Sequence, residues 1–138
     1  MPNTIVTDTG VIFSAFDSAD RDHDRCMELL GSGATLLIPA PVVVELDWLA
    51  RSRRVPAASL FLLSSIVSDS VLVIDLERED YARALEFVVR YADLPLDLVD
   101  ASVVAVAERL EQDTIATLDR RHFSVVRPLH VDAFTLVP

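Results

Sequence analysis

Lysine is absent from the 138 residues of the chain, and all twelve basic side chains are arginine. This absence excludes chemistry that depends on a catalytic lysine. It removes the P-loop of nucleotide-binding proteins, which holds phosphates with a Gly-Lys-Ser/Thr sequence. It also weakens the case for phosphoryl transfer through an acceptor aspartate, because such enzymes ordinarily place a lysine beside that residue.

Cysteine is nearly absent as well, since Cys26 is the only one. One cysteine excludes an internal disulfide and suits a reducing, cytoplasmic compartment. The N-terminal residues show no signal-peptide pattern. The apolar stretches are interrupted at Pro39, Ser64 and Asp97, well short of the roughly 20 residues of a membrane span. We therefore expect a cytoplasmic protein without a membrane segment, folded as one domain over residues 1–138.

Positive charge is also scarce, because 22 acidic residues oppose 12 basic ones and the net charge is −10. This balance excludes a protein that coats nucleic acid through a generally basic surface. It does not exclude an enzyme that holds a phosphodiester through metal ions, because bound cations reverse the local sign of the charge.

Apolar runs and turn residues predict strands that alternate with helices. Strands are expected at 4–7, 34–38, 71–74, 114–117 and 134–137, and helices from residue 11, at 20–30, after Pro41, after Pro56, at 78–91 and at 97–112. This alternation is typical of an α/β fold with a parallel sheet between two layers of helices. In such folds, functional side chains gather at the carboxyl ends of the strands.

Acidic residues stand at or just after these strand ends. Asp8 follows the first strand and Asp119 the fourth, while Glu45 flanks the apolar face of the helix after the second strand. Asp97 and Asp100 begin the apolar helix that precedes the fourth strand. Each acid alone is compatible with a turn, a helix cap, a capping box or an ion pair.

Taken together, the acids predict a metal site. Carboxylates brought to one edge of a sheet repel each other unless a hard cation lies between them, and Mg²⁺ and Mn²⁺ prefer such oxygen ligands. A helix dipole keeps ligands at a helix start ionised. The residues themselves therefore indicate an acid cluster that binds metal and acts on phosphate.

Four segments also carry a resemblance to a known family. In chain order they are VTDTGVIFSAF, VVVELDWLA, LPLDLVDASVVAVAER and TIATLDRRHFSVV. In this order and spacing the chain resembles PIN domains, specifically the VapC-type toxins of bacterial toxin–antitoxin pairs, over nearly its whole length. The matching positions are Asp8, Glu45, Asp100 and Asp119 for the acidic quartet, Asp97 for an additional acid, Thr117 for a small hydroxyl residue and Thr9 for a frequent serine or threonine. Gly10 departs from the bulkier residue expected there.

The resemblance implies a three-layer α/β/α fold and a metal-dependent endoribonuclease. The quartet would hold Mg²⁺ or Mn²⁺, and Asp97 would support it. Metal-activated water would attack the phosphate and leave a 5′-phosphate and a 3′-hydroxyl. Transfer RNA or ribosomal RNA would be the substrate, a VapB-like antitoxin the inhibitor, and a homodimer the assembly. The RNA and the antitoxin come from the resemblance alone.

Several residues around the quartet are expected to contact RNA. Arg120 and Arg121 directly follow the fourth acid, and arginine binds phosphate through two parallel hydrogen bonds. Thr9 and Thr117 are expected beside the same phosphate.

Three other segments carry weaker expectations. The arginines at 51, 53 and 54 fit either RNA contact or favourable charge at a helix end. For Trp48, a place in the core is favoured over a base-stacking platform. The apolar segment 60–67 is expected to pack in the core and, in part, against an antitoxin or a second copy.

Two alternatives use the same sequence features. One is a PIN fold that has lost catalysis and only binds a partner or RNA, against which the intact quartet argues. The other is a metal-dependent phosphatase or DNA nuclease with the same acids. A comparison of RNA and DNA cleavage separates this last alternative from a ribonuclease.

Overall fold

Five parallel strands form the central sheet of the computed structural model, which describes residues 3–138. The strands are β1 (Thr4–Thr7), β2 (Thr35–Pro39), β3 (Val71–Ile74), β4 (Thr114–Ala116) and β5 (Thr135–Val137). They lie in the order β3-β2-β1-β4-β5, and every neighbouring pair is parallel. The carboxyl ends of all strands therefore lie at one edge of the sheet.

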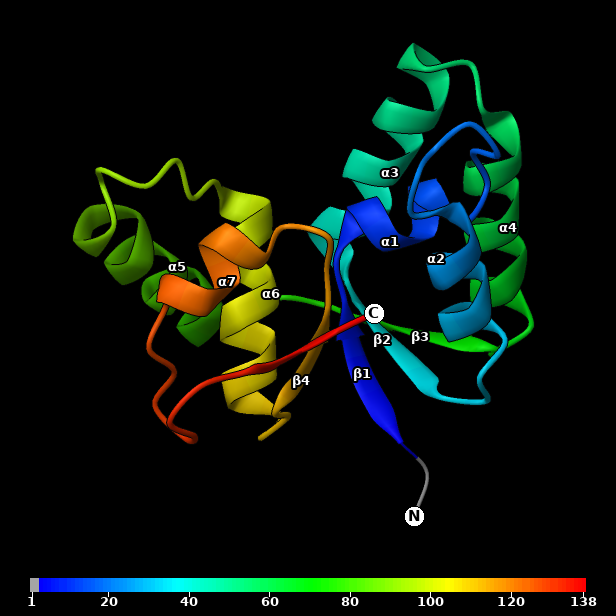
Figure 1. Cartoon of the computed structure of the whole chain (residues 1–138). Coiled ribbons are helices and arrows are strands. Elements are labelled where there is room, and N and C mark those ends of the chain that lie inside the picture. Colours follow the sequence, from blue (N-terminus) through cyan, green and yellow to red (C-terminus); the bar gives the residue numbers. More distant parts are fainter. Residues whose placement is uncertain (1–2) are drawn as a thin grey trace.

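Helices cover both faces of this sheet. They are α1 (Thr9–Ser14), α2 (His23–Leu30), α3 (Ala40–Ser52), α4 (Pro56–Val67), α5 (Arg78–Arg90), α6 (Leu98–Arg109) and α7 (Arg120–Val125). Figure 1 shows α1, α2 and α4 on one side and α5, α6 and α7 on the other. The predicted three-layer α/β/α fold is confirmed.

The core lies on both sides of β1 and along α6. Ile5 and Val6 of β1 are buried, and every residue of α6 from Ala101 to Ala107 is buried. A helix that is apolar all round needs cover on all sides, and α6 contacts β1, β2, β4 and α5. This burial fixes the first turn of α6, with its two acids, beside the end of β1.

Most predicted elements are present, with shifts at their ends. The helix predicted from residue 20 begins at His23, because the carboxylate of Asp20 accepts a hydrogen bond from the backbone N–H of Asp22 (2.8 Å) and holds a turn there. The first helix begins at Thr9, two residues earlier than predicted, because Asp8 caps it. The short helix α7 was not predicted. Among residues 3–138, no helix is long and apolar enough to cross a membrane.

The prediction that Trp48 lies in the core is wrong. Its side chain is 66% exposed, and Val44, one turn earlier on α3, is 72% exposed. The buried stripe of α3 consists of Val42, Leu46 and Ala50. Trp48 lies outside this stripe on the helix surface, so its burial would require a partner beyond the residues described.

Candidate active site

Asp8 stands at the junction of β1 and α1, at the carboxyl edge of the sheet. Its Oδ1 accepts a hydrogen bond from the backbone N–H of Thr9 (2.8 Å), and its Oδ2 accepts one from Oγ1 of Thr117 (3.0 Å). The side chain is buried. The pKa of Asp8 is raised to about 6, mainly by burial. The two hydrogen bonds lower the pKa, and the charges of Glu45 and Asp119 raise it. A buried carboxyl with this pKa is poised to bind a cation.

Thr117 and Asp119 reach Asp8 because β4 pairs with β1. The backbone N–H of Asp119 donates to Oγ1 of Thr117 (3.0 Å), so one hydroxyl contacts both acidic residues. Asp119 is also the N-cap of α7, since its Oδ1 accepts a hydrogen bond from the backbone N–H of His122 (3.2 Å). The fourth acid is therefore fixed through its backbone and its side chain.

Asp97 and Asp100 lie where α6 begins. Oδ1 of Asp97 accepts a hydrogen bond from the backbone N–H of Asp100 (2.9 Å), which is the predicted capping contact. Burial raises the pKa of Asp100 to about 8, and the charges of Asp97, Asp8 and Asp119 add to that rise. The acids that follow β1 and β4 therefore lie near enough to the start of α6 for their charges to act on Asp100.

Glu45 enters this region from α3. Its negative charge contributes to the raised pKa of Asp8. Within residues 3–138 no arginine lies at ion-pair distance from Glu45, so the ion-pair alternative for this residue is not found there. Asp47, two residues on, instead pairs with Arg51 (3.0 Å) on another side of the helix.

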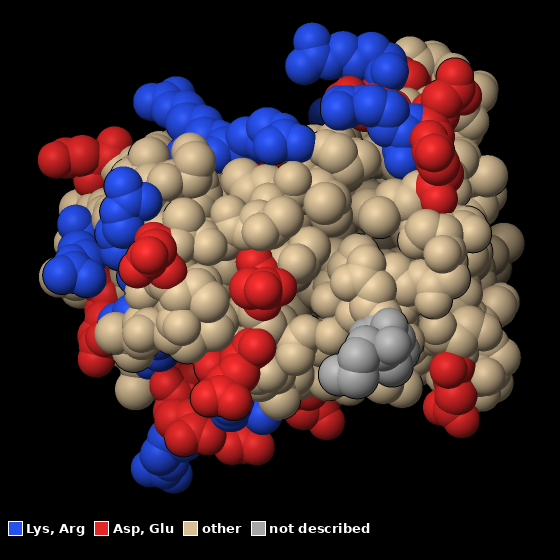
Figure 2. Space-filling view, turned by 60° about the horizontal axis from the view of Figure 1, so that its bottom comes forward, with Lys and Arg blue, Asp and Glu red and all other residues tan. Residues whose placement is uncertain are grey.

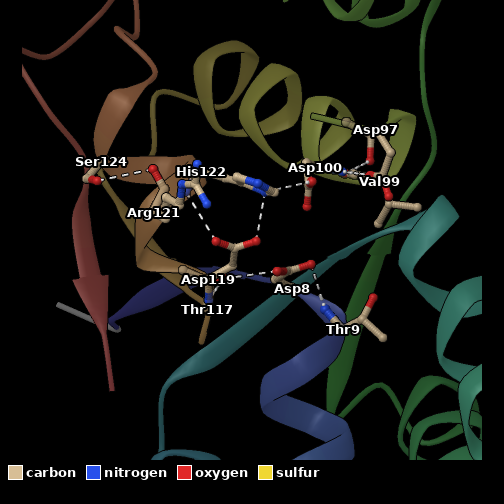
Figure 3. Close-up of polar contacts among 11 residues, drawn as sticks. Asp8, Thr9, Asp97, Val99, Asp100, Thr117, Asp119, Arg121, His122 and Ser124 are labelled. Carbon is tan, nitrogen blue, oxygen red and sulfur yellow. Dashed lines mark hydrogen bonds and ion pairs between the residues drawn. The ribbon is translucent and has the colours of Figure 1, made fainter. Parts of the chain in front are cut away.

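His122 is the side chain at the site to which the sequence assigned no role. Its Nδ1 lies 2.7 Å from Oδ2 of Asp119 and 3.3 Å from Oδ2 of Asp100, as Figure 3 shows. These are ion-pair distances, although the ring does not have the alignment of a hydrogen bond with either oxygen. The spacing in the sequence could have indicated this contact, because His122 comes three positions after the N-cap residue Asp119 and so lies close to its side chain.

The residues fit a hard divalent cation by chemistry. The donors are carboxylate oxygens from four elements, and burial, followed by the charges of neighbouring acids, raises the pKa values of Asp8 and Asp100. The hydroxyl of Thr9 is buried beside Asp8 without a hydrogen-bond partner in residues 3–138, which leaves a polar group for a ligand. Within the same residues no three acid, histidine or cysteine side chains converge at metal-binding distance, and His122 stands between two of the acids.

The two expected RNA-binding arginines differ in their surroundings. Nη2 of Arg120 donates to the carbonyl oxygen of Pro138 (2.5 Å), so its guanidinium lies against the end of β5. Arg121 is exposed at the start of α7, and its carbonyl oxygen accepts a hydrogen bond from the hydroxyl of Ser124 (3.3 Å). Of the two, Arg121 has the side chain without a hydrogen bond or an ion pair in the described residues.

Comparisons with known proteins agree with this geometry. The PIN domain profile matches residues 5–128. Ribonuclease VapC26 of Mycobacterium tuberculosis is 34% identical over 135 residues, which cover 97% of this chain and all of that protein.

Solved structures share the fold. VapC20 of Mycobacterium tuberculosis, described as a toxin that cleaves the sarcin–ricin loop, matches with a TM-score of 0.73 at 21% identity, over 80% of this chain and 86% of that one. VapBC2 of Rickettsia felis, bound to promoter DNA, matches with a TM-score of 0.68 at 16% identity, over 98% and 99%. With the profile match and the full-length relative, the chain belongs to the PIN-domain family, in its VapC group.

Proposed function

We propose that this chain is a metal-dependent endoribonuclease, the toxin of a VapBC-type toxin–antitoxin pair, that cuts transfer RNA or ribosomal RNA in the cytoplasm. The observation that carries the proposal is the chain of contacts that links three acids: the hydroxyl of Thr117 contacts Oδ2 of Asp8 and the backbone N–H of Asp119, and Nδ1 of His122 lies 2.7 Å from Asp119 and 3.3 Å from Asp100. Burial, with the charges of neighbouring acids, raises the pKa values of Asp8 and Asp100. Such a cluster attracts divalent cations, and the relationship to a ribonuclease over the whole chain supports RNA as the substrate.

The chain's own residues hold the site in order. Asp8, Glu45, Asp100 and Asp119 would bind Mg²⁺ or Mn²⁺. When bound, the ion supplies positive charge for the phosphate and makes a water molecule more acidic. Thr117 orients Asp8 through its hydroxyl, and α7 holds Asp119 through the backbone of His122.

Remaining residues act around this cluster. Asp97 orders the first turn of α6 and so places Asp100. Arg121, Thr9 and, after release from Pro138, Arg120 would contact the phosphates of the RNA. A VapB-like antitoxin and a second copy of the chain complete the proposed assembly, for which the toxin–antitoxin complexes among the solved structures give support.

The test is a cleavage assay with total cellular RNA and, in parallel, with DNA. RNA should be cut in Mg²⁺ or Mn²⁺, left intact in EDTA, and cut to products with 5′-phosphates. Asp8→Asn, Asp100→Asn and Asp119→Asn should each lower the rate by more than the roughly 10- to 100-fold that loss of an outer partner of a metal ligand costs. Asp93→Asn, at an exposed acid outside the cluster, is the matched control.

Each result bears on a different part of the proposal. Cleavage of DNA with RNA intact would assign a DNA nuclease. Products with 2′,3′-cyclic phosphates would indicate metal-free ribonuclease chemistry. Normal rates in the three asparagine variants would place the active site elsewhere.

A further inference from the structure

Trp48 is the only tryptophan of the chain, and it lies exposed on the same helix as Glu45. The two residues are three positions apart on α3. At 100° and 1.5 Å per residue they are separated by about 60° around the helix and about 4.5 Å along it. Trp48 is therefore the next side chain beyond Glu45 on the same flank of α3.

This flank is not the side of α3 that contacts the neighbouring helix α4. Asp47 marks the side of α3 that α4 covers, since its Oδ1 accepts a hydrogen bond from the hydroxyl of Ser59 on α4 (2.8 Å). Trp48 is turned by about 100° from Asp47 around α3. With 66% of its surface exposed, the indole offers an aromatic surface three positions along α3 from Glu45.

Unpaired positive charge follows at the end of the same helix. Arg53 and Arg54 are exposed, and within residues 3–138 neither guanidinium lies at ion-pair distance from a carboxylate. Arg51, by contrast, is paired with Asp47 (3.0 Å). Figure 2 shows arginine side chains gathered in groups near the upper edge of the view, while acids dominate its lower left. Free arginines on a chain of net charge −10 favour a polyanion.

We propose that Trp48 stacks on an unpaired base of the RNA, while Arg53 and Arg54 bind the phosphates next to that base. The inference rests on the proposed ribonuclease function. An exposed aromatic side chain and unpaired arginines on one segment are the combination that binds single-stranded nucleic acid, with little preference among bases. The platform holds the strand next to Glu45, so a base-paired strand, whose base faces are covered, binds worse.

A fluorescence titration reads the platform directly, because Trp48 is the sole source of tryptophan emission. Full-length protein with the Asp8→Asn change, which prevents cleavage, is titrated with a single-stranded oligouridylate. We expect saturable quenching of the emission. The same oligouridylate annealed to oligoadenylate should quench much less at equal concentration.

Matched variants separate stacking from general contact. Trp48→Ala should weaken binding of the oligouridylate roughly 5- to 100-fold, and Trp48→Phe should restore most of it because a flat ring remains. Tyr81→Ala removes another exposed aromatic, 55% exposed on α5, and should change nothing. Changing Arg53 and Arg54 to Gln should weaken binding and flatten its salt dependence, whereas Arg90→Gln, at the exposed end of α5, should not.

Cleavage kinetics distinguish failure of this inference from failure of the proposed function. Trp48→Ala should raise KM for cellular RNA and leave kcat nearly unchanged, as loss of uniform binding does. If the Trp48→Ala variant cleaves RNA with the KM of the wild-type protein, the proposed stacking of Trp48 on a base is wrong. The same holds if oligouridylate does not quench the emission. Neither result contradicts the proposed ribonuclease function. If acrylamide quenches the emission of Trp48 less at higher protein concentration in the absence of RNA, the proposed stacking is also wrong, because Trp48 then lies in a contact between two copies of the chain. Absence of any RNA cleavage by the wild-type protein removes both proposals.

Discussion

The hydroxyl oxygen of Thr117 lies 3.0 Å from Oδ2 of Asp8, although 109 positions separate the two residues in the chain. Adjacent pairing of β1 and β4 creates this contact. The same oxygen accepts a hydrogen bond from the backbone N–H of Asp119 (3.0 Å). Thr117 is buried, so no solvent competes for these bonds. One hydroxyl therefore sets the position of one acid relative to another.

Replacement of this hydroxyl should lower activity more than stability. Thr117→Val keeps the shape of the side chain but leaves Oδ2 of Asp8 and the backbone N–H of Asp119 without these hydrogen bonds. We expect a roughly 10- to 100-fold loss of RNA cleavage and a loss of about 1–3 kcal/mol in the free energy of unfolding. Thr117→Ser keeps the hydroxyl and serves as the control. Equal activity of the valine and serine variants would show that the hydroxyl does not orient Asp8.

His122 should compete with the cation for the acids. Its Nδ1 lies against Asp119 and Asp100, while Asp119 keeps its position through other bonds to Thr117 and to the His122 backbone. We expect His122→Ala to tighten Mn²⁺ binding by up to about fivefold, the worth of one partly exposed ion pair. Calorimetric titration with Mn²⁺ measures it. Weaker binding in the variant would mean that the imidazole is itself a ligand or holds one in place.

Asp100 should make the metal-free protein less stable as the pH rises. Its pKa is raised from 3.8 to about 8 in the fold, so the unfolded chain gives up this proton first. The contribution of Asp100 to stability is complete below pH 4 and is lost as the pH rises towards 8. Asp100→Asn, which cannot ionise, should therefore match the wild-type Tm near pH 4 and exceed it at pH 8 in EDTA.

Thermal unfolding of both proteins across this pH range provides the measurement. Asp93→Asn, at an exposed acid outside the cluster, controls for the change in net charge. Addition of Mn²⁺ at pH 8 should raise the Tm of the wild-type protein more than that of Asp100→Asn. A lower Tm for Asp100→Asn at pH 8 would show that attraction between Asp100 and His122 outweighs the cost of burying the charge.

Most of the fold was predictable because most elements carry a local signal of their own. Runs such as Thr4–Thr7 and Val71–Ile74 are short, apolar and bounded by turn residues, and the helices between them follow as a consequence. The helix α7 was missed because six residues with one buried side chain, Phe123, carry almost no periodicity. The sequence feature that indicates α7 is its N-cap residue, Asp119. This residue is equally compatible with a turn or with a metal ligand.

The site was predictable only as a set of acids. Parallel strands bring their carboxyl ends together, so Asp8 and Asp119 could be placed at one edge from their positions alone. The position of His122 between Asp100 and Asp119 depends on the orientation of α7, which the sequence did not indicate. Trp48 was misplaced because a large aromatic side chain is usually buried, although its spacing from Leu46 already turned it away from the apolar stripe.

A surface for the proposed antitoxin lies along α4. Within the segment 60–67, Leu62 and Ser65 are buried, whereas Leu60, Leu63 and Val67 are exposed. The expectation that core packing accounts for most of this segment holds fully only for Leu62 and Ser65, and the contact with an antitoxin or a second copy stays a prediction. The exposed residues offer apolar area to such a partner. Val43 and Val44 of α3 line a depression with Leu62 and Leu63, which extends this area towards α3.

The antitoxin should inhibit by placing a basic side chain among the acids. Lysine is absent from this chain, and within residues 3–138 no arginine pairs with Asp8, Glu45, Asp100 or Asp119. A partner's arginine would therefore offset the burial and the like charges that raise the pKa values of Asp8 and Asp100. Expression of the chain alone should slow growth, and co-expression with the antitoxin should restore it. In the purified complex, Arg→Ala at the inserted position should return nuclease activity while Leu60 and Leu63 keep the complex assembled, and Arg→Lys should return less. Inhibition that survives the alanine change undiminished would show that the antitoxin blocks RNA sterically, without entering the acid cluster.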